Sequence, residues 1–167
     1  MDWPAEKTFT FERTDRGFNV ICDLTLRRTA PGAASVYIGM ESVLNFLAPS
    51  APDRYFEMAG TRYPLRWGAH IAAPDLRVVD EWQGISVTLA APAAQEFWIT
   101  PIETVSESED GFERIYQGSQ IIAVWPVELS QGAEWKCRFS LKIECPLQAV
   151  PSALKNSTVT AAPQVAD

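Results

Sequence analysis

Histidine is almost absent from this 167-residue chain, in which His70 is the only one. A catalytic triad needs a histidine or an equivalent base beside a serine or cysteine, and the chain has no G-x-S-x-G elbow. Zinc sites use closely spaced cysteine and histidine ligands, whereas Cys22, Cys137 and Cys145 lie far apart without a C-x-x-C pair. The sequence therefore argues against a hydrolase triad, a bound metal or another cofactor.

Long apolar runs and concentrated positive charge are also missing. No stretch of about 18 apolar residues occurs, and the first residues lack a basic segment followed by an apolar one. The 14 basic residues are scattered among 21 acidic ones, with a formal charge of -7, so a phosphate backbone would meet no continuous positive strip. We therefore expect no membrane and no nucleic-acid partner. The odd number of cysteines favours reduced thiols in a cytoplasmic protein.

The chain instead shows a repeated two-residue alternation of apolar and polar side chains, which is typical of strands with one buried face. The alternation is clear in four segments, at residues 18–28, 35–40, 85–89 and 135–143. Weaker versions predict further strands at residues 9–13, 55–58, 78–82, 97–102 and 120–127. The last two contain Pro101 and Pro126, which indicate edges or bulges because proline cannot donate to a ladder.

Turn-forming clusters separate these segments too closely for long helices, at residues 14–17, 30–34, 48–53, 90–94, 106–111 and 130–132. Only residues 41–47 leave room for even a helical turn or two. Short strands without helical segments of about 10–15 residues predict an all-β fold, an antiparallel β-sandwich of residues 7–145. From residue 146 to 167, small, polar and proline residues predict a flexible C-terminal tail.

Residues that could carry chemistry are few. The acidic loop at residues 106–113 lacks the regular order of a calcium loop, so a solvated turn is favoured. Four carboxylates could converge on one face of a sandwich and act as a general acid and base, namely Asp80, Glu81, Glu103 and Glu113. The alternative is that they are surface charges or anchors of turns. The chain also has six tryptophans, eight phenylalanines and four tyrosines, rings that fill cores or stack on sugar faces.

Three segments together resemble one known family. They read APDRYFE at residues 51–57, VVDEWQGISVTL at residues 78–89, and IETVSESEDGFERIYQGSQIIAVWPVEL at residues 102–129. Their order and spacing are similar to those of the C-terminal β-sandwich domain of glycoside hydrolase family 57 alpha-amylases and 4-alpha-glucanotransferases. The resemblance covers residues 7–144 and implies a galactose-mutarotase-like supersandwich. The chain departs from the family before residue 51. Its strand there reads YIGMESVLNFLAPS, whereas family members have an acidic, aromatic strand that leads into a Gly-Asp turn.

The resemblance transfers no catalytic residue to this chain. In the family, the nucleophile Glu and the acid/base Asp lie in an N-terminal distorted barrel, for which 167 residues of strand pattern leave no room. The resemblance therefore implies a noncatalytic accessory module of an alpha-glucan enzyme, either cut from a longer protein or encoded alone. Its expected partners are an alpha-glucan or oligosaccharide and a catalytic barrel, in cis or in trans.

Aromatic and charged residues of the matched segments form the candidate carbohydrate site, namely Arg54, Tyr55, Trp82, Glu103, Glu113, Arg114 and Tyr116. A sugar site needs a flat ring for the CH face and paired donors or acceptors for adjacent hydroxyls, which Trp82, Arg54 and Glu103 together would supply. The structural alternative pairs Arg54 with a carboxylate inside the sandwich and places Trp82 in the core.

Two further functions stay open. The same tyrosine, tryptophan and arginine side chains suit an interaction module whose motif-bearing face docks against a catalytic barrel. Analogy with the supersandwich fold adds a third candidate function, that of a small aldose mutarotase. Such an enzyme needs a general base and an acid near the sugar ring. His70 with Glu103 is the only candidate pair of this kind that contains a histidine.

Overall fold

The computed structural model describes residues 3–108, 111–145 and 157–161. These residues form strands and no helix, so no helix in them could cross a membrane. The strands are β1 (Ala5–Thr14), β2 (Gly17–Arg27), β3 (Ala34–Leu44), β4 (Arg54–Met58), β5 (Thr61–Pro64), β6 (Ala69–Ile71), β7 (Asp75–Asp80), β8 (Ile85–Ala90), β9 (Glu96–Ser108), β10 (Gly111–Leu129), β11 (Glu134–Glu144) and β12 (Ser157–Ala161).

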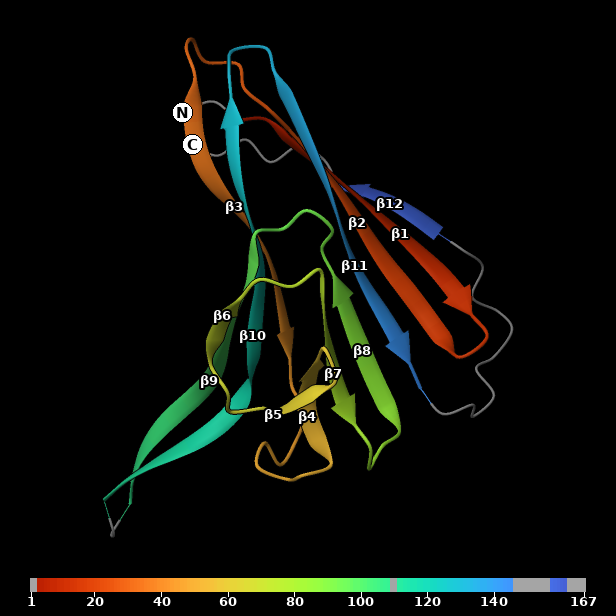
Figure 1. The fold of residues 1–167 in the computed structure, drawn as a ribbon, viewed down its shortest axis with the longest axis vertical. Helices are drawn as coiled ribbons and strands as arrows, with labels where there is room; N and C mark the ends of the chain where they lie inside the picture. The colour runs from red at the N-terminus through yellow and green to blue at the C-terminus, as the bar shows by residue number, and fades with distance from the viewer. Residues whose placement is uncertain (1–2, 109–110, 146–156, 162–167) are drawn as a thin grey trace.

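These strands build two sheets that lie face to face (Figure 1). The larger sheet has eight strands in the order β12-β1-β2-β11-β8-β7-β4-β5, and the smaller has four in the order β3-β10-β9-β6. Neighbouring strands run antiparallel throughout, for example β1 beside β2 and β9 beside β10. The predicted all-β antiparallel sandwich is therefore confirmed.

The core lies between the two sheets, and β10 shows how the sequence places it there. Alternate residues of this strand, Ile121, Ala123, Trp125 and Val127, are at most 4% exposed. They belong to one apolar cluster with side chains from β2, β4, β7, β8, β9 and β11. Burial of apolar surface contributes about 25 cal/mol per Å², so this shared layer is the main source of stability.

The four clear strand predictions are confirmed in β2, β3, β8 and β11, and the weaker ones in β1, β4, β9 and β10. The strand predicted at residues 78–82 corresponds to β7, but β7 ends at Asp80, so Glu81 and Trp82 lie in a turn instead. Residues 41–47, the only segment with room for a helical turn, form none, because β3 continues through Leu44 in register with Ser119 of β10. The turn expected at residues 106–111 is shorter than predicted, since β9 runs to Ser108 and β10 begins at Gly111. The short strands β5 and β6 were not expected from the sequence.

Pro101 and Pro126, the prolines within the predicted strands, lie where their strand has a neighbour on one side only. Pro126 pairs with Tyr37 of β3, beyond the last β9 partner of β10, which is Glu96 opposite Val124. Pro101 pairs with Ser119, beyond the last β6 contact of β9 at Ile99. A missing backbone N–H therefore costs no ladder bond at either position, as the sequence predicted.

Only part of the predicted tail, residues 146–167, is described. Within it, Ser157–Ala161 form β12, which pairs antiparallel with β1 at the edge of the larger sheet. Residues 146–156 and 162–167 lie outside the described residues, so the flexible tail stays a prediction for them.

The three sequence motifs meet at one end of the sandwich (Figure 1). This end carries the β3–β4 loop that leads into Arg54, the β7–β8 turn and the projecting β9–β10 hairpin. Segments that are up to about fifty residues apart in the sequence therefore contribute to a single end of the molecule.

Candidate functional site

Trp82 occupies the β7–β8 turn, at the end of the sandwich where the motifs meet. The turn is fixed by two hydrogen bonds, from the Gln83 N–H to Oδ1 of Asp80 (2.9 Å) and from the Glu81 N–H to the Asp53 carbonyl (2.8 Å). Gly84 closes it with φ of 68°, a conformation that side-chain-bearing residues disfavour. These constraints hold the Trp82 indole in solvent, where it is 78% exposed.

Arg54 points inward from β4 and pairs with Asp80 of β7. Its Nε lies 3.1 Å from Oδ2 of Asp80, and its Nη1 lies 3.1 Å from Oδ1 of Asp53. The Asp80 side chain is 1% exposed and the Arg54 side chain 13%. A buried carboxylate of this kind needs both partners to offset its lost hydration. The structural alternative for Arg54, an ion pair inside the sandwich, is confirmed.

Tyr55 points outward from the same strand into a second polar cluster. Its hydroxyl donates to Oε1 of Glu81 (2.7 Å), and Arg62 contacts that carboxylate at 3.1 Å while its guanidinium lies 4.0 Å from the Tyr55 ring centre. Burial, and then the hydrogen bond to Glu81, raise the pKa of Tyr55 above its usual value. This cluster orients Glu81 directly before Trp82.

A groove of about 400 Å³ opens beside the same turn. Its charged lining is formed by Arg16, Arg77, Glu81 and Glu144. Asp80 also lines the groove, but its carboxylate is 1% exposed and already paired with Arg54. Arg77 is held by Glu57 at 2.9 Å across the strand pair. Charged donors and acceptors of this density can bind vicinal hydroxyl groups.

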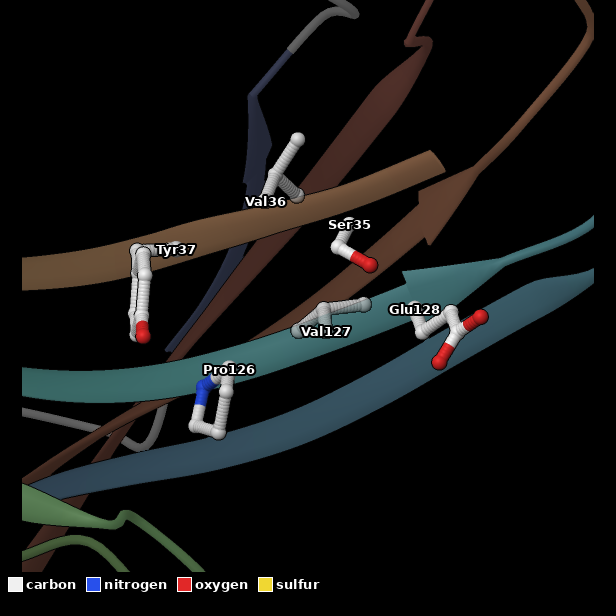
Figure 2. A pocket seen from close by; sticks show the side chains of 6 residues that line it. All are labelled: Ser35, Val36, Tyr37, Pro126, Val127 and Glu128. Atoms are coloured by element: carbon white, nitrogen blue, oxygen red, sulfur yellow. The ribbon is translucent and has the colours of Figure 1, made fainter. Parts of the chain in front are cut away.

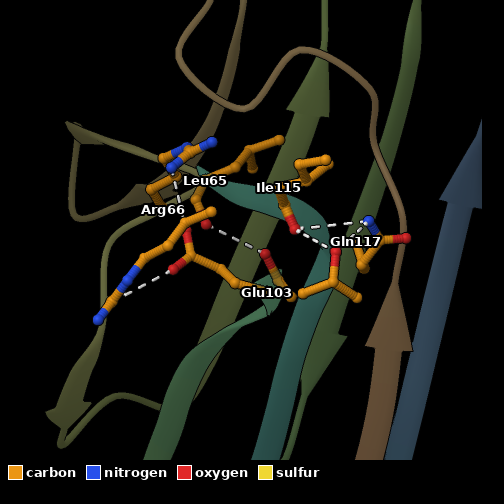
Figure 3. Close-up of polar contacts among 8 residues, drawn as sticks. Leu65, Arg66, Glu103, Ile115 and Gln117 are labelled. Atoms are coloured by element: carbon orange, nitrogen blue, oxygen red, sulfur yellow. Dashed lines mark hydrogen bonds and ion pairs between the residues drawn. The ribbon is translucent and has the colours of Figure 1, made fainter. Parts of the chain in front are cut away.

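The second group of predicted residues centres on Glu103 of β9. Its Oε1 accepts a hydrogen bond from Nη1 of Arg66 at 3.0 Å, as Figure 3 shows. Its Oε2 lies 3.7 Å from Nη1 of Arg114. Arg66 belongs to the segment between β5 and β6, so the ion pair joins the edge of the larger sheet to the smaller one.

Tyr116 lies opposite Glu103 in the β9–β10 register and closes the core beneath this ion pair. Its hydroxyl is 2.6 Å from Oγ of Ser119, which in turn donates to the Leu65 carbonyl at 3.2 Å. Burial raises the pKa of Tyr116, and the hydrogen bond with Ser119 partly offsets that rise. Arg66, Ser119 and Leu65 were missed by the sequence reasoning, because nothing local in their segments indicates partners in another strand.

The predicted trio is not brought together. Trp82 is exposed rather than in the core, and Arg54 is bound to Asp80. Glu103 lies on the smaller sheet, where it is bound to Arg66. No hydrogen bond or ion pair of the described residues links the three. The candidate site therefore divides into a Trp82 part and a Glu103 part.

The four carboxylates that were candidates for a general acid and base do not converge. Asp80 faces inward against Arg54, whereas Glu81 faces outward against Tyr55 and Arg62. Glu103 is held by Arg66, and Glu113 lies opposite Ser106 on the other face of the β9–β10 hairpin. Each one acts as an anchor or a surface charge, which was the alternative.

His70 and Glu103 are separated by the smaller sheet. His70 pairs with Trp98 and stacks on its ring at a centroid distance of 5.0 Å. Trp98 and Glu103 are five residues apart on one strand, so their side chains point to opposite faces. The pair required for a mutarotase is therefore not formed.

Another hollow lies away from all of these residues, between β3 and β10 (Figure 2). This groove of about 310 Å³ is lined by Ser35, Val36, Tyr37, Pro126, Val127 and Glu128. It holds one carboxylate and none of the predicted site residues. In the described part of the chain, no group of three or more histidine, cysteine or acidic side chains is placed to hold a metal ion.

The comparisons with known proteins agree with this fold. Alpha-amylase 1 of Dictyoglomus thermophilum is 38% identical over 107 residues, which make up 61% of this chain and 15% of that protein. The structure of the 4-alpha-glucanotransferase from Thermococcus litoralis is similar at a TM-score of 0.53 and 22% identity, covering 85% of this chain and 18% of that one. The chain thus spans less than a fifth of the length of either relative.

A putative aldose 1-epimerase from Escherichia coli K12 has the same fold, with a TM-score of 0.60, 12% identity, and coverage of 85% of this chain and 61% of that one. At these identities the two solved structures establish the fold alone, here the galactose-mutarotase-like supersandwich. The sequence model of the family described as Alpha-amylase/4-alpha-glucanotransferase, C-terminal, matches residues 3–139. Because that match covers most of the chain, the protein belongs to the alpha-amylase/4-alpha-glucanotransferase C-terminal domain family.

Proposed function

We propose that the chain is a noncatalytic accessory module of an alpha-glucan-acting enzyme and that its Trp82 end contacts the glucan. The observation that carries this proposal is the 78% exposure of the Trp82 ring on a turn that is itself fixed by hydrogen bonds. An exposed indole presents a flat apolar face on which the CH face of a sugar ring can stack. A rigid indole also loses little conformational entropy when a sugar stacks on it.

The groove beside the turn supplies the polar half of such a site. Its arginine and carboxylate groups, among them Arg77 and Glu81, are already oriented by Glu57 and Tyr55. Preoriented groups bind adjacent sugar hydroxyls at a smaller entropic cost than free side chains do. The ring would contact the CH face of a sugar while these groups bind its hydroxyls.

The names of the relatives support an alpha-glucan as the ligand, since one is an alpha-amylase and the other a 4-alpha-glucanotransferase. The module would increase the local concentration of the glucan at a catalytic barrel on the same or a separate chain. A mutarotase activity is not favoured, because His70 and Glu103 lie on opposite faces of the sheet.

A titration of the purified chain with maltoheptaose, followed by tryptophan fluorescence, tests this proposal. Of the six tryptophans, Trp82 alone is among the exposed large apolar residues. A sugar stacked on it would therefore change the surroundings, and hence the fluorescence, of the one solvent-exposed indole. We expect a saturable change that is absent in Trp82→Ala. Tyr37→Ala is the matched control, since Tyr37 is also exposed (71%) but lies on β3, away from the turn.

Circular dichroism of both variants checks that the fold is intact. Cellohexaose, whose glucose units are β-linked, reports whether the site selects alpha-glucans. No fluorescence change in the wild-type chain at millimolar maltoheptaose would refute glucan binding, and an equal loss in both variants would refute the role of Trp82.

A further inference from the structure

The β9–β10 hairpin continues as a two-stranded ribbon beyond the rest of the smaller sheet (Figure 1). The last β3 partner of β10 is Leu44, opposite Ser119, and the last β6 partner of β9 is Ala69, opposite Ile99. From Glu103 and Tyr116 outward, the described residues of the ribbon pair only with each other. A hairpin with two open edges is marginally stable in water, so a partner surface would stabilise it.

The two faces of this ribbon differ in character. One face, which we call the ribbon outer face, is mixed: its Gln117 side chain donates to Oγ1 of Thr104 (3.2 Å) and to the Ile115 carbonyl (3.4 Å), as Figure 3 shows, and its Ile115 side chain is 42% exposed. The opposite face, which we call the ribbon inner face, continues the core side of the sheet beyond Tyr116. By register it carries Val105, Glu107, Phe112 and Arg114.

The ribbon inner face is apolar at its centre and charged around it. Phe112 is 80% exposed and Val105 61%, and the register places them diagonally across the two strands, within side-chain reach. Arg114 and Glu107 lie beside them, with the Arg114 side chain 73% exposed. An aromatic anchor next to an arginine is typical of the energetic centre of a protein interface.

The base of the ribbon is fixed, so its inner face is presented in a defined direction. Glu103 is tied to Arg66 at 3.0 Å, and Tyr116 is tied through Ser119 to the Leu65 carbonyl. These contacts fix both strands at the point where the ribbon leaves the sandwich. A prearranged surface of this kind loses little entropy on binding.

We propose that the ribbon inner face docks against the catalytic portion of a protein of this family, with Phe112 and Val105 in an apolar recess and Arg114 opposite a carboxylate or carbonyl group. The occupant follows from the comparisons, because this chain corresponds to 15% of one relative and 18% of the other. The remaining length of those proteins provides the facing surface. This inference rests on the proposed accessory role and specifies the surface through which it acts.

A chimera tests the contact directly. In it, this chain replaces the segment of the Dictyoglomus thermophilum Alpha-amylase 1 that it matches, and the photoreactive residue p-benzoylphenylalanine stands at position 112 or, as control, at position 37. Tyr37 is comparably exposed, at 71%, but lies on β3 rather than on the ribbon. We expect light to cross-link position 112 to peptides of the amylase portion, at least about tenfold more than position 37.

A second measurement does not depend on a folded chimera. The 167-residue chain, which has its own buried core, is mixed with the Alpha-amylase 1 fragment that lacks the matched segment. Binding is followed by surface plasmon resonance, and Phe112→Ser should weaken it at least about tenfold, the effect of losing one interface anchor. Ile115→Ser removes an apolar side chain that is 42% exposed on the ribbon outer face and should leave binding unchanged.

Absence of cross-links from position 112, or cross-links only to a second copy of the chimera, would overturn the proposal. So would equal binding by wild-type and Phe112→Ser chains. Maltoheptaose binding is measured on the same proteins and depends on Trp82, so loss of sugar binding with retained docking refutes glucan binding alone. Retained sugar binding without docking refutes the ribbon contact alone.

Discussion

Asp80 and Arg54 form an ion pair that also determines the shape of the neighbouring turn. One carboxylate oxygen of Asp80 lies 3.1 Å from Nε of Arg54, and the other accepts the Gln83 N–H at 2.9 Å. The exposed position of Trp82 therefore depends on a buried charge. Because the Asp80 side chain is only 1% exposed, its free energy is sensitive to the loss of either partner.

Asp80→Ala should destabilise the fold and loosen the β7–β8 turn. The substitution leaves the Gln83 N–H without its acceptor and removes one of the two carboxylates that contact Arg54. Loss of one member of a buried pair costs about 3 kcal/mol, which urea unfolding measures as a lower midpoint at unchanged slope.

The matched control is Arg77→Ala, which breaks the pair with Glu57 on the outer face of the same strands. The Arg77 side chain is 42% exposed, so its loss should cost less than about 1 kcal/mol. Equal destabilisation by the two substitutions would show that the Asp80 pair has no special role.

Gly17→Ala should be strongly destabilising, because β11 passes close to the start of β2. A methyl group at Gly17 would clash with the Ile143 carbonyl oxygen, which is a backbone atom that cannot rotate away. Strain of this kind costs about 1–3 kcal/mol or more. Thermal unfolding measures it, with Gly68→Ala as the matched control, since its nearest atom would lie at 3.5 Å. A Gly17→Ala protein as stable as Gly68→Ala would contradict the close approach.

Local patterns explain why most strands could be predicted and some could not. The alternation in β8 and β11 is visible within each segment, because each strand buries one face. The segment Thr61–Pro64 is too short to show a period, and its strand forms only because β4 pairs with it. The boundaries of β9 and β10 were underestimated because their ribbon end is paired but not buried on one face.

The candidate site shows the same division. The sequence placed Trp82 at the end of a predicted strand, whereas the structure ends β7 at Asp80 and places the indole in the exposed turn that follows. The Arg66–Glu103 pair joins residues 37 positions apart and depends on how the β5–β6 segment crosses to the smaller sheet. Charged residues carry no signal of their partner, so only the three-dimensional structure separates the Trp82 part from the Glu103 part.

The stability of the fold should fall at alkaline pH because of the buried Cys137 thiol. Burial raises the pKa of this thiol to about 12 from an ordinary value of 9.0. The unfolded chain therefore releases this proton first, so the stabilising effect is complete below pH 9.0 and is lost between pH 9.0 and about 12. The loss is at most about 1.4 kcal/mol per pH unit.

Urea unfolding of the wild-type chain and of Cys137→Val between pH 8 and pH 11, roughly the window in which thiols titrate, measures this effect. The valine variant lacks the thiol, so its stability should fall less steeply with pH. A parallel decline in both proteins would show that Cys137 does not contribute.

Ser119→Ala should cost more stability than Tyr116→Phe, although the two hydroxyl groups are hydrogen-bonded to each other at 2.6 Å. Ser119 is 1% exposed and also donates to the Leu65 carbonyl. Its removal therefore leaves two buried groups without a partner, at about 1–3 kcal/mol, whereas Tyr116→Phe leaves the bond from Ser119 to Leu65 in place. Because the Ser119 hydrogen bond lowers the pKa of Tyr116, Ser119→Ala should also raise that pKa further. Ultraviolet titration of the phenol measures the shift, and an unchanged or lower pKa would show that the hydrogen bond does not form in solution.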